Sequence, residues 1–116
     1  MTDNDATTAT LDDQVTHIAD VRAAVPIEAG KIGHHTVLSV GGARVIVLSF
    51  DAGQQMREHR SHHPLLLHTF DGKVRVTADG RSYDLDPGGL LYLPNAMPHS
   101  VEALEPSRIS LTPIGV

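Results

Sequence analysis

The sequence contains no cysteine and no tryptophan, and its only aromatic side chains are those of two Phe and two Tyr. Without cysteine the chain has no disulfide framework, no thiolate zinc site and no cysteine nucleophile. No apolar run approaches the roughly 18 residues that a membrane-spanning helix needs. Basic residues are also few, with 9 Lys and Arg against 14 Asp and Glu and a net charge of −5. We therefore expect no membrane span, and no nucleic acid partner because nucleic acid binding needs a basic face.

The N-terminal residues, MTDNDATTATLDDQ, carry neither the basic region nor the apolar core of a secretion signal. We therefore expect a protein of the cytoplasm. The 116 residues are 41% hydrophobic, which is enough for one packed core in one domain. Residues 1–9 are small, polar and acidic, and this composition predicts a disordered tail.

A periodic apolar pattern begins at Thr10, which is a candidate N-cap. Leu11, Val15 and Ile18 follow at spacings of four and three, which predicts a short amphipathic helix over about residues 11–19. Residues 10–33 are then a short helix and a lead-in segment, ahead of a main domain over residues 34–116.

The chain after residue 33 is typical of short β-strands joined by turns. Gly41-Gly42, Asp71-Gly72 and Asp79-Gly80 each separate two runs of strand-forming residues, which predicts three hairpins. About eight strands are expected, over residues 34–40, 43–50, 64–70, 73–78, 81–85, 90–94, 99–104 and 108–114. Short, evenly spaced strands with such turns predict an all-β sandwich or barrel.

Two of these strands, at residues 45–50 and 64–70, are apolar at successive positions, so both faces of each should be covered. A second subunit would supply the outer layer, and we therefore expect a homodimer. The alternative is that the N-terminal segment of the same chain covers these strands.

Four of the eight histidines lie close together, at positions 59, 62, 63 and 68. On a strand, side chains at i and i+2 share a face about 6.6 Å apart, whereas those at i+4 are about 13 Å apart. The side chain that shares a face with His59 at chelating distance is therefore that of Ser61. His63 is too far from His59 to bind the same ion, unless the turn before Pro64 folds it back. A second short apolar strand, followed by the turn at residues 94–96, delivers His99 to the start of the next strand.

These features resemble the small single-domain cupins of the cupin type-2 family, whose fold is a jelly-roll barrel, or double-stranded β-helix. The resemblance covers about residues 36–113. The first family motif, G-x5-H-x-H-x3-4-E-x6-G, is matched by Gly53, His59 and Gly72. The second, G-x5-P-x-G-x2-H-x3-N, is matched by Gly88, Pro94 and His99, with Ala96 in place of its second Gly.

The resemblance implies one divalent transition metal (Zn, Fe, Ni, Mn or Cu), held by three ligands of the first motif and the histidine of the second. Here His59 and His99 occupy ligand positions, while Ser61 and Leu65 replace the other two. A third ligand from His62 or His63 would give a three-histidine set. The alternative is that the two motif histidines line a pocket without any cofactor.

If Leu65 takes the place of the family's glutamate, the inner face of its strand forms an apolar pocket for a small molecule with one polar group. The expected pocket-lining residues are Met56, Ser61, Leu65, Leu67, Tyr92 and Met97. We expect a non-catalytic or sensor-like module that binds a small molecule, a weakly held divalent metal, or both. The alternative is a metal-dependent oxygenase or isomerase; no catalytic residue is legible in either case.

Overall fold

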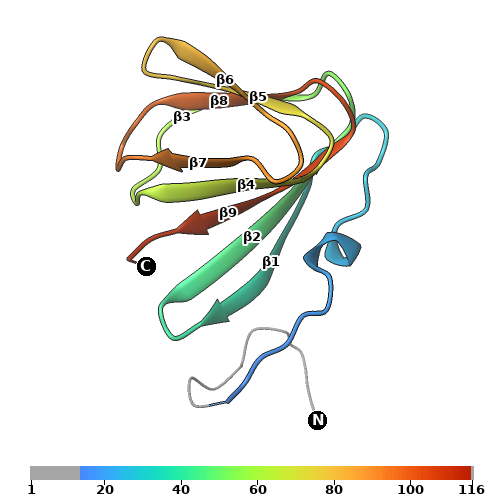
Figure 1. Cartoon of the computed structure of the whole chain (residues 1–116), viewed down its shortest axis with the longest axis vertical. Coiled ribbons are helices and arrows are strands. Elements are labelled where there is room, and N and C mark those ends of the chain that lie inside the picture. Colours follow the sequence, from blue (N-terminus) through green and yellow to red (C-terminus); the bar gives the residue numbers. More distant parts are fainter. Residues whose placement is uncertain (1–13, 116) are drawn as a thin grey trace.

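The computed structural model describes residues 14–115 (Figure 1). Over this range the chain forms one 3-10 helix, η1 (Val21–Ala24), and nine strands. The strands are β1 (Gly33–Val40), β2 (Ala43–Phe50), β3 (Gln55–His59), β4 (Leu65–Asp71), β5 (Val74–Ala78), β6 (Arg81–Leu85), β7 (Leu90–Leu93), β8 (His99–Ala103) and β9 (Ser107–Pro113).

The strands form two antiparallel sheets that face each other across the core (Figure 1). One sheet has the order β1-β2-β9-β4-β7 and the other the order β3-β8-β5-β6. Inward positions alternate with outward ones along β4, β5 and β8, as the two-residue period of a strand requires. The main core consists of Leu48, Phe50, Leu67, Val74, Val76, Leu85, Val101, Ala103 and Ile109. This arrangement confirms the predicted all-β jelly roll.

The eight predicted strands are all present, and the structure adds β3, which the sequence reasoning missed. Gln55–His59 is short and largely exposed, so it lacks the apolar alternation by which the other strands were recognised. The omission matters, because β3 carries His59.

Two of the three predicted hairpins are confirmed. Gly41 and Gly42 both have positive φ between β1 and β2, and Asp79 and Gly80 both have positive φ between β5 and β6. The prediction is wrong for Asp71-Gly72: β4 pairs with β7 and β9, whereas β5 pairs with β6 and β8. This turn carries the chain from one sheet to the other, a tertiary choice that a local Asp-Gly signal cannot reveal.

The predicted helix over residues 11–19 is wrong where the structure describes it, since residues 14–19 contain no helix. The single helical turn lies later, at η1, where the Asp20 carboxylate accepts a hydrogen bond from the Arg22 N–H at 3.0 Å. The apolar spacing of Val15 and Ile18 misled the prediction, because both side chains are exposed and pack against no core. The predicted disordered tail lies outside the described residues.

An ion clasp, formed by Asp20, Arg22, Asp71 and Arg108, fastens the N-terminal segment to the barrel. Arg22 bonds Asp20 at 2.9 Å and Asp71 at 3.2 Å, and Arg108 bonds the other oxygen of Asp71 at 2.8 Å. Arg108 Nε also donates to the Val25 carbonyl at 2.8 Å. The clasp therefore holds the segment against the outer face of the five-stranded sheet.

The segment covers part of that outer face. Val25 is buried, and the buried Ser49 donates its hydroxyl to the Pro26 carbonyl at 3.0 Å. The N-terminal segment thus supplies cover for one end of β2 within a single chain, which is the alternative considered for the two-sided burial of that strand. Over the part of the chain described, no helix is long and apolar enough to cross a membrane.

The clasp predicts an acid-sensitive contribution to stability. Hydrogen bonding to the Arg22 side chain lowers the pKa of Asp20 below its ordinary value of about 4. A carboxyl whose folded-state pKa is lowered stabilises the fold above its unfolded-state pKa, and this contribution is lost as pH falls through the folded-state value. Asp20→Asn should therefore lower Tm at pH 7, and the difference from the parent should be smaller at pH 3 than at pH 7. Glu105→Gln, which removes a carboxylate without a partner in residues 14–115, is the control; an equal Tm difference for Asp20→Asn at both pH values would contradict the prediction.

Candidate functional site

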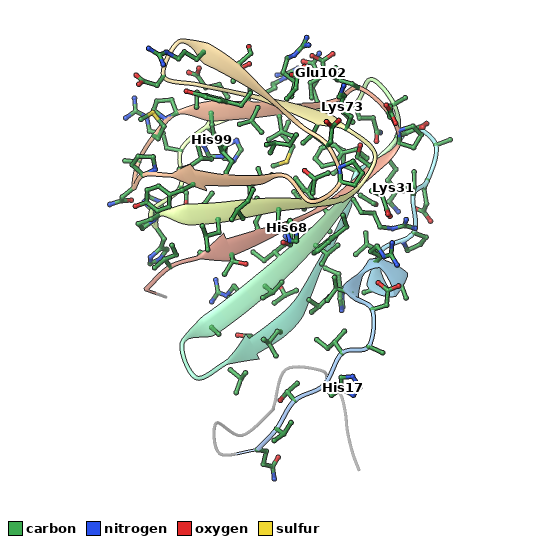
Figure 2. The ribbon with its side chains drawn as sticks, viewed as in Figure 1. His17, Lys31, His68, Lys73, His99 and Glu102 are labelled. Atoms are coloured by element: carbon green, nitrogen blue, oxygen red, sulfur yellow. The ribbon has the colours of Figure 1, made fainter. Side chains whose placement is uncertain are left out.

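His59 and His99 are brought together at one end of the barrel, although they are forty positions apart in the sequence. They are register partners on the adjacent strands β3 and β8. Their ring centroids lie 4.4 Å apart, with the ring planes inclined at 57°. His99 is 2% exposed and lies between the two sheets in Figure 2, whereas His59 is on the exposed edge strand. The pair thus joins a buried imidazole to one that is open to solvent.

An irregularity in β3 makes this pairing possible. Met56 pairs with Val101 and His59 pairs with His99, so three steps along β3 match two steps along β8. Without this bulge, Glu58 would lie opposite His99 and His59 would turn to the other face. The extra residue therefore selects which side chain meets His99.

Both imidazoles are held in the same way by the backbone. The Nδ1 atom of His59 lies 2.9 Å from the Arg57 carbonyl oxygen, and that of His99 lies 2.9 Å from the Met97 carbonyl oxygen. A carbonyl can only accept, so each Nδ1 carries the proton and donates it. Each neutral ring is then left with a lone pair on Nε2. The site accordingly offers two adjacent acceptors that can receive a hydrogen bond or bind a metal ion.

The surroundings of the pair are apolar. Ala78, the register partner of His99 on β5, packs in a small buried cluster with Leu65 and Leu93. Met97 and Leu91, both partly buried, pack against the same cluster. The two acceptors therefore lie at the edge of an apolar end of the barrel, where a hydrogen bond is stronger than in bulk water.

A cavity of about 570 Å³ is lined in part by residues that are next to the pair in the sequence. It is lined by Glu58, Thr77, Ala78, Asp79, Gly80, Met97 and Pro98. Glu58 precedes His59, and Pro98 precedes His99, but neither imidazole lines the cavity itself. Neither Glu58 nor Asp79 has an ion pair within residues 14–115, so both carboxylates are available to a ligand.

The comparisons with known proteins show the family and the fold of the chain. Residues 45–115 match the AraC-like ligand-binding domain family. The chain belongs to this family. Its fold is that of the small cupins, which confirms the resemblance found in the motifs. No curated protein has significant sequence similarity to it.

Solved structures share the cupin fold at low sequence identity. A conserved protein of unknown function from Streptococcus pyogenes has 21% identity and a TM-score of 0.79, with 97% of this chain and 98% of that chain covered. A cupin superfamily protein from Desulfitobacterium hafniense has 14% identity and a TM-score of 0.77, with coverage of 89% and 94%. An RmlC-like cupin from Desulfovibrio desulfuricans has 20% identity and a TM-score of 0.74, with coverage of 85% and 95%. At these identities the similarity establishes the fold alone.

The side chains of this AraC-like domain do not fit the four-ligand metal centre of the cupin motifs. Over residues 14–115, no three His, Cys, Asp or Glu side chains form a group that could hold a metal ion. His62 and His63 therefore do not join the pair. The Ser61 hydroxyl accepts a hydrogen bond from the His63 N–H at 3.2 Å, and Leu65 is buried in the apolar cluster.

The expected pocket-lining residues are found in different places. Leu67 and Met56 belong to or pack against the main core, and Ser61 is partly buried. Met97 lines the cavity. Tyr92 points away from the interior, because its neighbours Leu91 and Leu93 pack inward and its own side chain is 55% exposed.

The remaining histidines lie apart from the pair. His68 is on the outer face of β4, where its ring centroid lies 4.8 Å from that of Phe70. Figure 2 shows His68 on the other side of the sheet from His99. His34 and His35 open β1 and line a separate groove beside the N-terminal segment. His17 is exposed in the N-terminal segment.

Sequence reasoning missed the polar residues of the cavity, Glu58, Thr77 and Asp79. Asp79 was recognised only as half of a turn, and Glu58 lies on the strand that was not predicted. The Asp79-Gly80 turn next to β5 was the one sequence feature that could have pointed to these residues. It predicts a carboxylate at the end of a strand, but it does not predict that this strand end lies near His99.

Proposed function

We propose that this domain binds a small organic molecule that donates hydrogen bonds, at the barrel end where His59 and His99 meet. The observation that carries the proposal is that both Nδ1 atoms are committed to backbone carbonyls. Both free Nε2 atoms are consequently acceptors, and the ligand has to supply the donor. An ammonium, hydroxyl or amide N–H group on the ligand meets this need, whereas a carboxylate does not.

The lining of the 570 Å³ cavity favours the same class of ligand. The cavity that Glu58 and Pro98 help to line includes two carboxylates and one hydroxyl, and no basic side chain. Its other side chains, Ala78, Met97 and Pro98, are apolar and suit a hydrocarbon or aromatic body. An amine or alcohol on a compact apolar body therefore fits better than an acid, because an acid would face unpaired carboxylates.

Three probes with the same phenyl body and different head groups test the proposal. Benzylamine should bind most tightly, benzyl alcohol more weakly, and benzoate not measurably, in titration calorimetry at pH 7.5. His59→Ala should lower the affinity for benzylamine by about tenfold, the size of one lost hydrogen bond to a charged group. His99→Gln tests the buried partner with a residue that keeps polarity and approximate volume.

His62→Ala is the matched control, since it removes an exposed histidine three positions from His59 and should leave binding unchanged. Circular dichroism establishes that each variant is folded. Equal binding of benzoate and benzylamine, or unchanged affinity in both pair variants, would contradict the proposal.

The alternative is a metal-dependent oxygenase or isomerase that uses the same two histidines. It would be favoured over the binding module if the purified untagged protein held one equivalent of a transition metal that was lost in both His59→Ala and His99→Gln. The cytoplasmic location expected from the sequence stays a prediction.

A further inference from the structure

The free nitrogens of His59 and His99 extend from one face of the four-stranded sheet. The two residues are register partners on β3 and β8, and cross-strand partners point to the same side of a sheet. In each ring Nδ1 is bonded to the carbonyl two residues earlier, at 2.9 Å in both cases. Nε2 is the ring nitrogen farther from the backbone. The two Nε2 atoms are therefore at the tips of neighbouring side chains.

The Nε2 atom of His99 is accessible, although the residue as a whole is buried. His99 is 2% exposed, and Nδ1 makes the one hydrogen bond that its side chain has within residues 14–115. In the same range, the Thr69 hydroxyl is the one side-chain polar atom that is both sealed from solvent and without a partner. Since the His99 Nε2 atom also has no partner, it is reached by solvent. A buried imidazole thus presents an acceptor atom to a ligand.

The spacing of the two rings favours one kind of donor. Their centroids are 4.4 Å apart and their planes are inclined at 57°, so the rings are not stacked face to face. A hydrogen bond from an N–H group is about 2.9 Å long, so two acceptors bonded to one tetrahedral nitrogen lie about 4.7 Å apart. That distance matches the separation of the rings. A guanidinium instead offers parallel N–H bonds, which suit the closely spaced oxygens of a carboxylate.

The surroundings of the pair penalise a ligand with too few donor hydrogens. Ala78, the register partner of His99 on β5, packs with Leu65 and Leu93 in the small apolar cluster. A ligand at this apolar end of the barrel displaces water from both Nε2 atoms, and an acceptor left unbonded costs free energy. An alcohol or a tertiary ammonium has one donor hydrogen and leaves one ring unbonded. Two donor hydrogens on one nitrogen satisfy both rings.

We propose that the head group of the ligand is a single ammonium nitrogen with at least two N–H bonds, which donates one hydrogen bond to the Nε2 atom of each imidazole. The site therefore selects primary and secondary amines over tertiary amines, quaternary ammonium ions and alcohols. This inference rests on the proposed function and narrows its ligand to one class. It also gives the bulge in β3 a role, because the extra residue brings His59, and not Glu58, opposite His99.

Benzylamine and its N-methyl, N,N-dimethyl and N,N,N-trimethyl derivatives test this bridge between the rings. They share the phenyl body and the positive charge but have three, two, one and no N–H bonds. Titration calorimetry at pH 7.5 should give similar affinities for the first two. The N,N-dimethyl compound should bind at least about tenfold more weakly than the N-methyl compound, because one hydrogen bond from a charged group is lost. The trimethyl ion should bind more weakly still.

His59→Phe separates the loss of a hydrogen bond from crowding by the added methyl groups, because it keeps an aromatic ring and removes its acceptor. With one imidazole left, a second N–H on the ligand has no partner. The N-methyl and N,N-dimethyl compounds should then bind this variant with affinities within about threefold of each other. His62→Ala is the control and should keep the tenfold step of the parent. A tenfold step that persists in His59→Phe would mean that crowding causes it, and would overturn the bridge.

Nitrogen-15 NMR of protein labelled at histidine measures the contact directly. Saturating benzylamine should shift the Nε2 resonances of both His59 and His99, and should leave those of His62 and His63 unchanged. A shift at only one of the two rings would overturn the bridge.

The bridge and the proposed function fail in different ways. Equal affinities of the N-methyl and N,N-dimethyl compounds for the parent protein would overturn the bridge, while the preference for benzylamine over benzoate, and with it the proposed function, would stand. If none of the amines binds, the proposed function fails and the bridge fails with it.

Discussion

Gly72→Ala is expected to destabilise the domain by about 3 kcal/mol or more, which corresponds to a fall in Tm of roughly 10 °C or more. Gly72 has φ 76°, a conformation that costs a residue with a Cβ atom about 1–2 kcal/mol. An added Cβ would also collide with the Pro106 carbonyl oxygen and the Ser107 hydroxyl. The Pro106 carbonyl is part of the backbone and cannot rotate away from the added Cβ. The buried Ser107 hydroxyl is also fixed, because it donates to the Glu105 carbonyl at 2.7 Å and accepts from the Lys73 N–H at 3.1 Å.

Gly53→Ala is the matched control. Gly53 is the other glycine of the same sequence motif and has φ 83°, but a Cβ added there would meet no atom within 4 Å beyond its chain neighbours. Its substitution should cost only about 1–2 kcal/mol for the left-handed backbone. Urea unfolding of both variants checks the pair, and equal destabilisation would show that the contact with Pro106 is not what demands glycine at position 72.

The strands were predictable because their signals are local. Runs of strand-forming residues and the two-residue turns Gly41-Gly42 and Asp79-Gly80 are features of neighbouring residues, so β1, β2, β5 and β6 could be recognised with their turns. The crossing of the chain from one sheet to the other between β4 and β5 could not be predicted, because it is decided by strand pairing far along the chain. The absence of a helix at Val15 and Ile18 could not be predicted either, because their helical spacing does not reveal that no core lies beside them.

The site was half predictable. The motif spacings pointed to His59 and His99. Ser61 and Leu65 indicated that the other two metal-ligand positions of the motif have no ligating side chain. Neither the motif spacing nor the alternation of faces along a strand could reveal that His59 faces His99. The bulge between Met56 and His59 puts the His59 side chain on the face opposite to the one that a regular strand would give. The left-handed backbone of Ala96, φ 62°, explains why the motif has glycine there, and its N–H ties the second motif to the Ser61 carbonyl at 3.1 Å.

Ser61→His combined with Leu65→Glu should convert this site into a divalent metal centre. The two changes restore the residues that the cupin motif has at these positions, next to two imidazoles whose Nε2 atoms are already available. We expect Ni²⁺ or Zn²⁺ to bind at least about 100-fold more tightly than to the parent, a gain of about 2.7 kcal/mol. Titration calorimetry and chelator competition measure the affinity.

Without metal the double variant should be less stable than the parent, because Leu65 is 5% exposed and a carboxylate there would be buried among Ala78 and Leu93. Saturating metal should then raise its Tm strongly, since an ion that binds only the folded chain adds its binding free energy to folding. Ser61→His with Leu65→Gln is the control, with the same shape and no charge, and should bind metal more weakly than the carboxylate variant. If the double variant folds and binds metal no better than the parent, then Ser61 and Leu65 are not what keeps metal affinity low, and the spacing of the His59–His99 pair itself must be the obstacle.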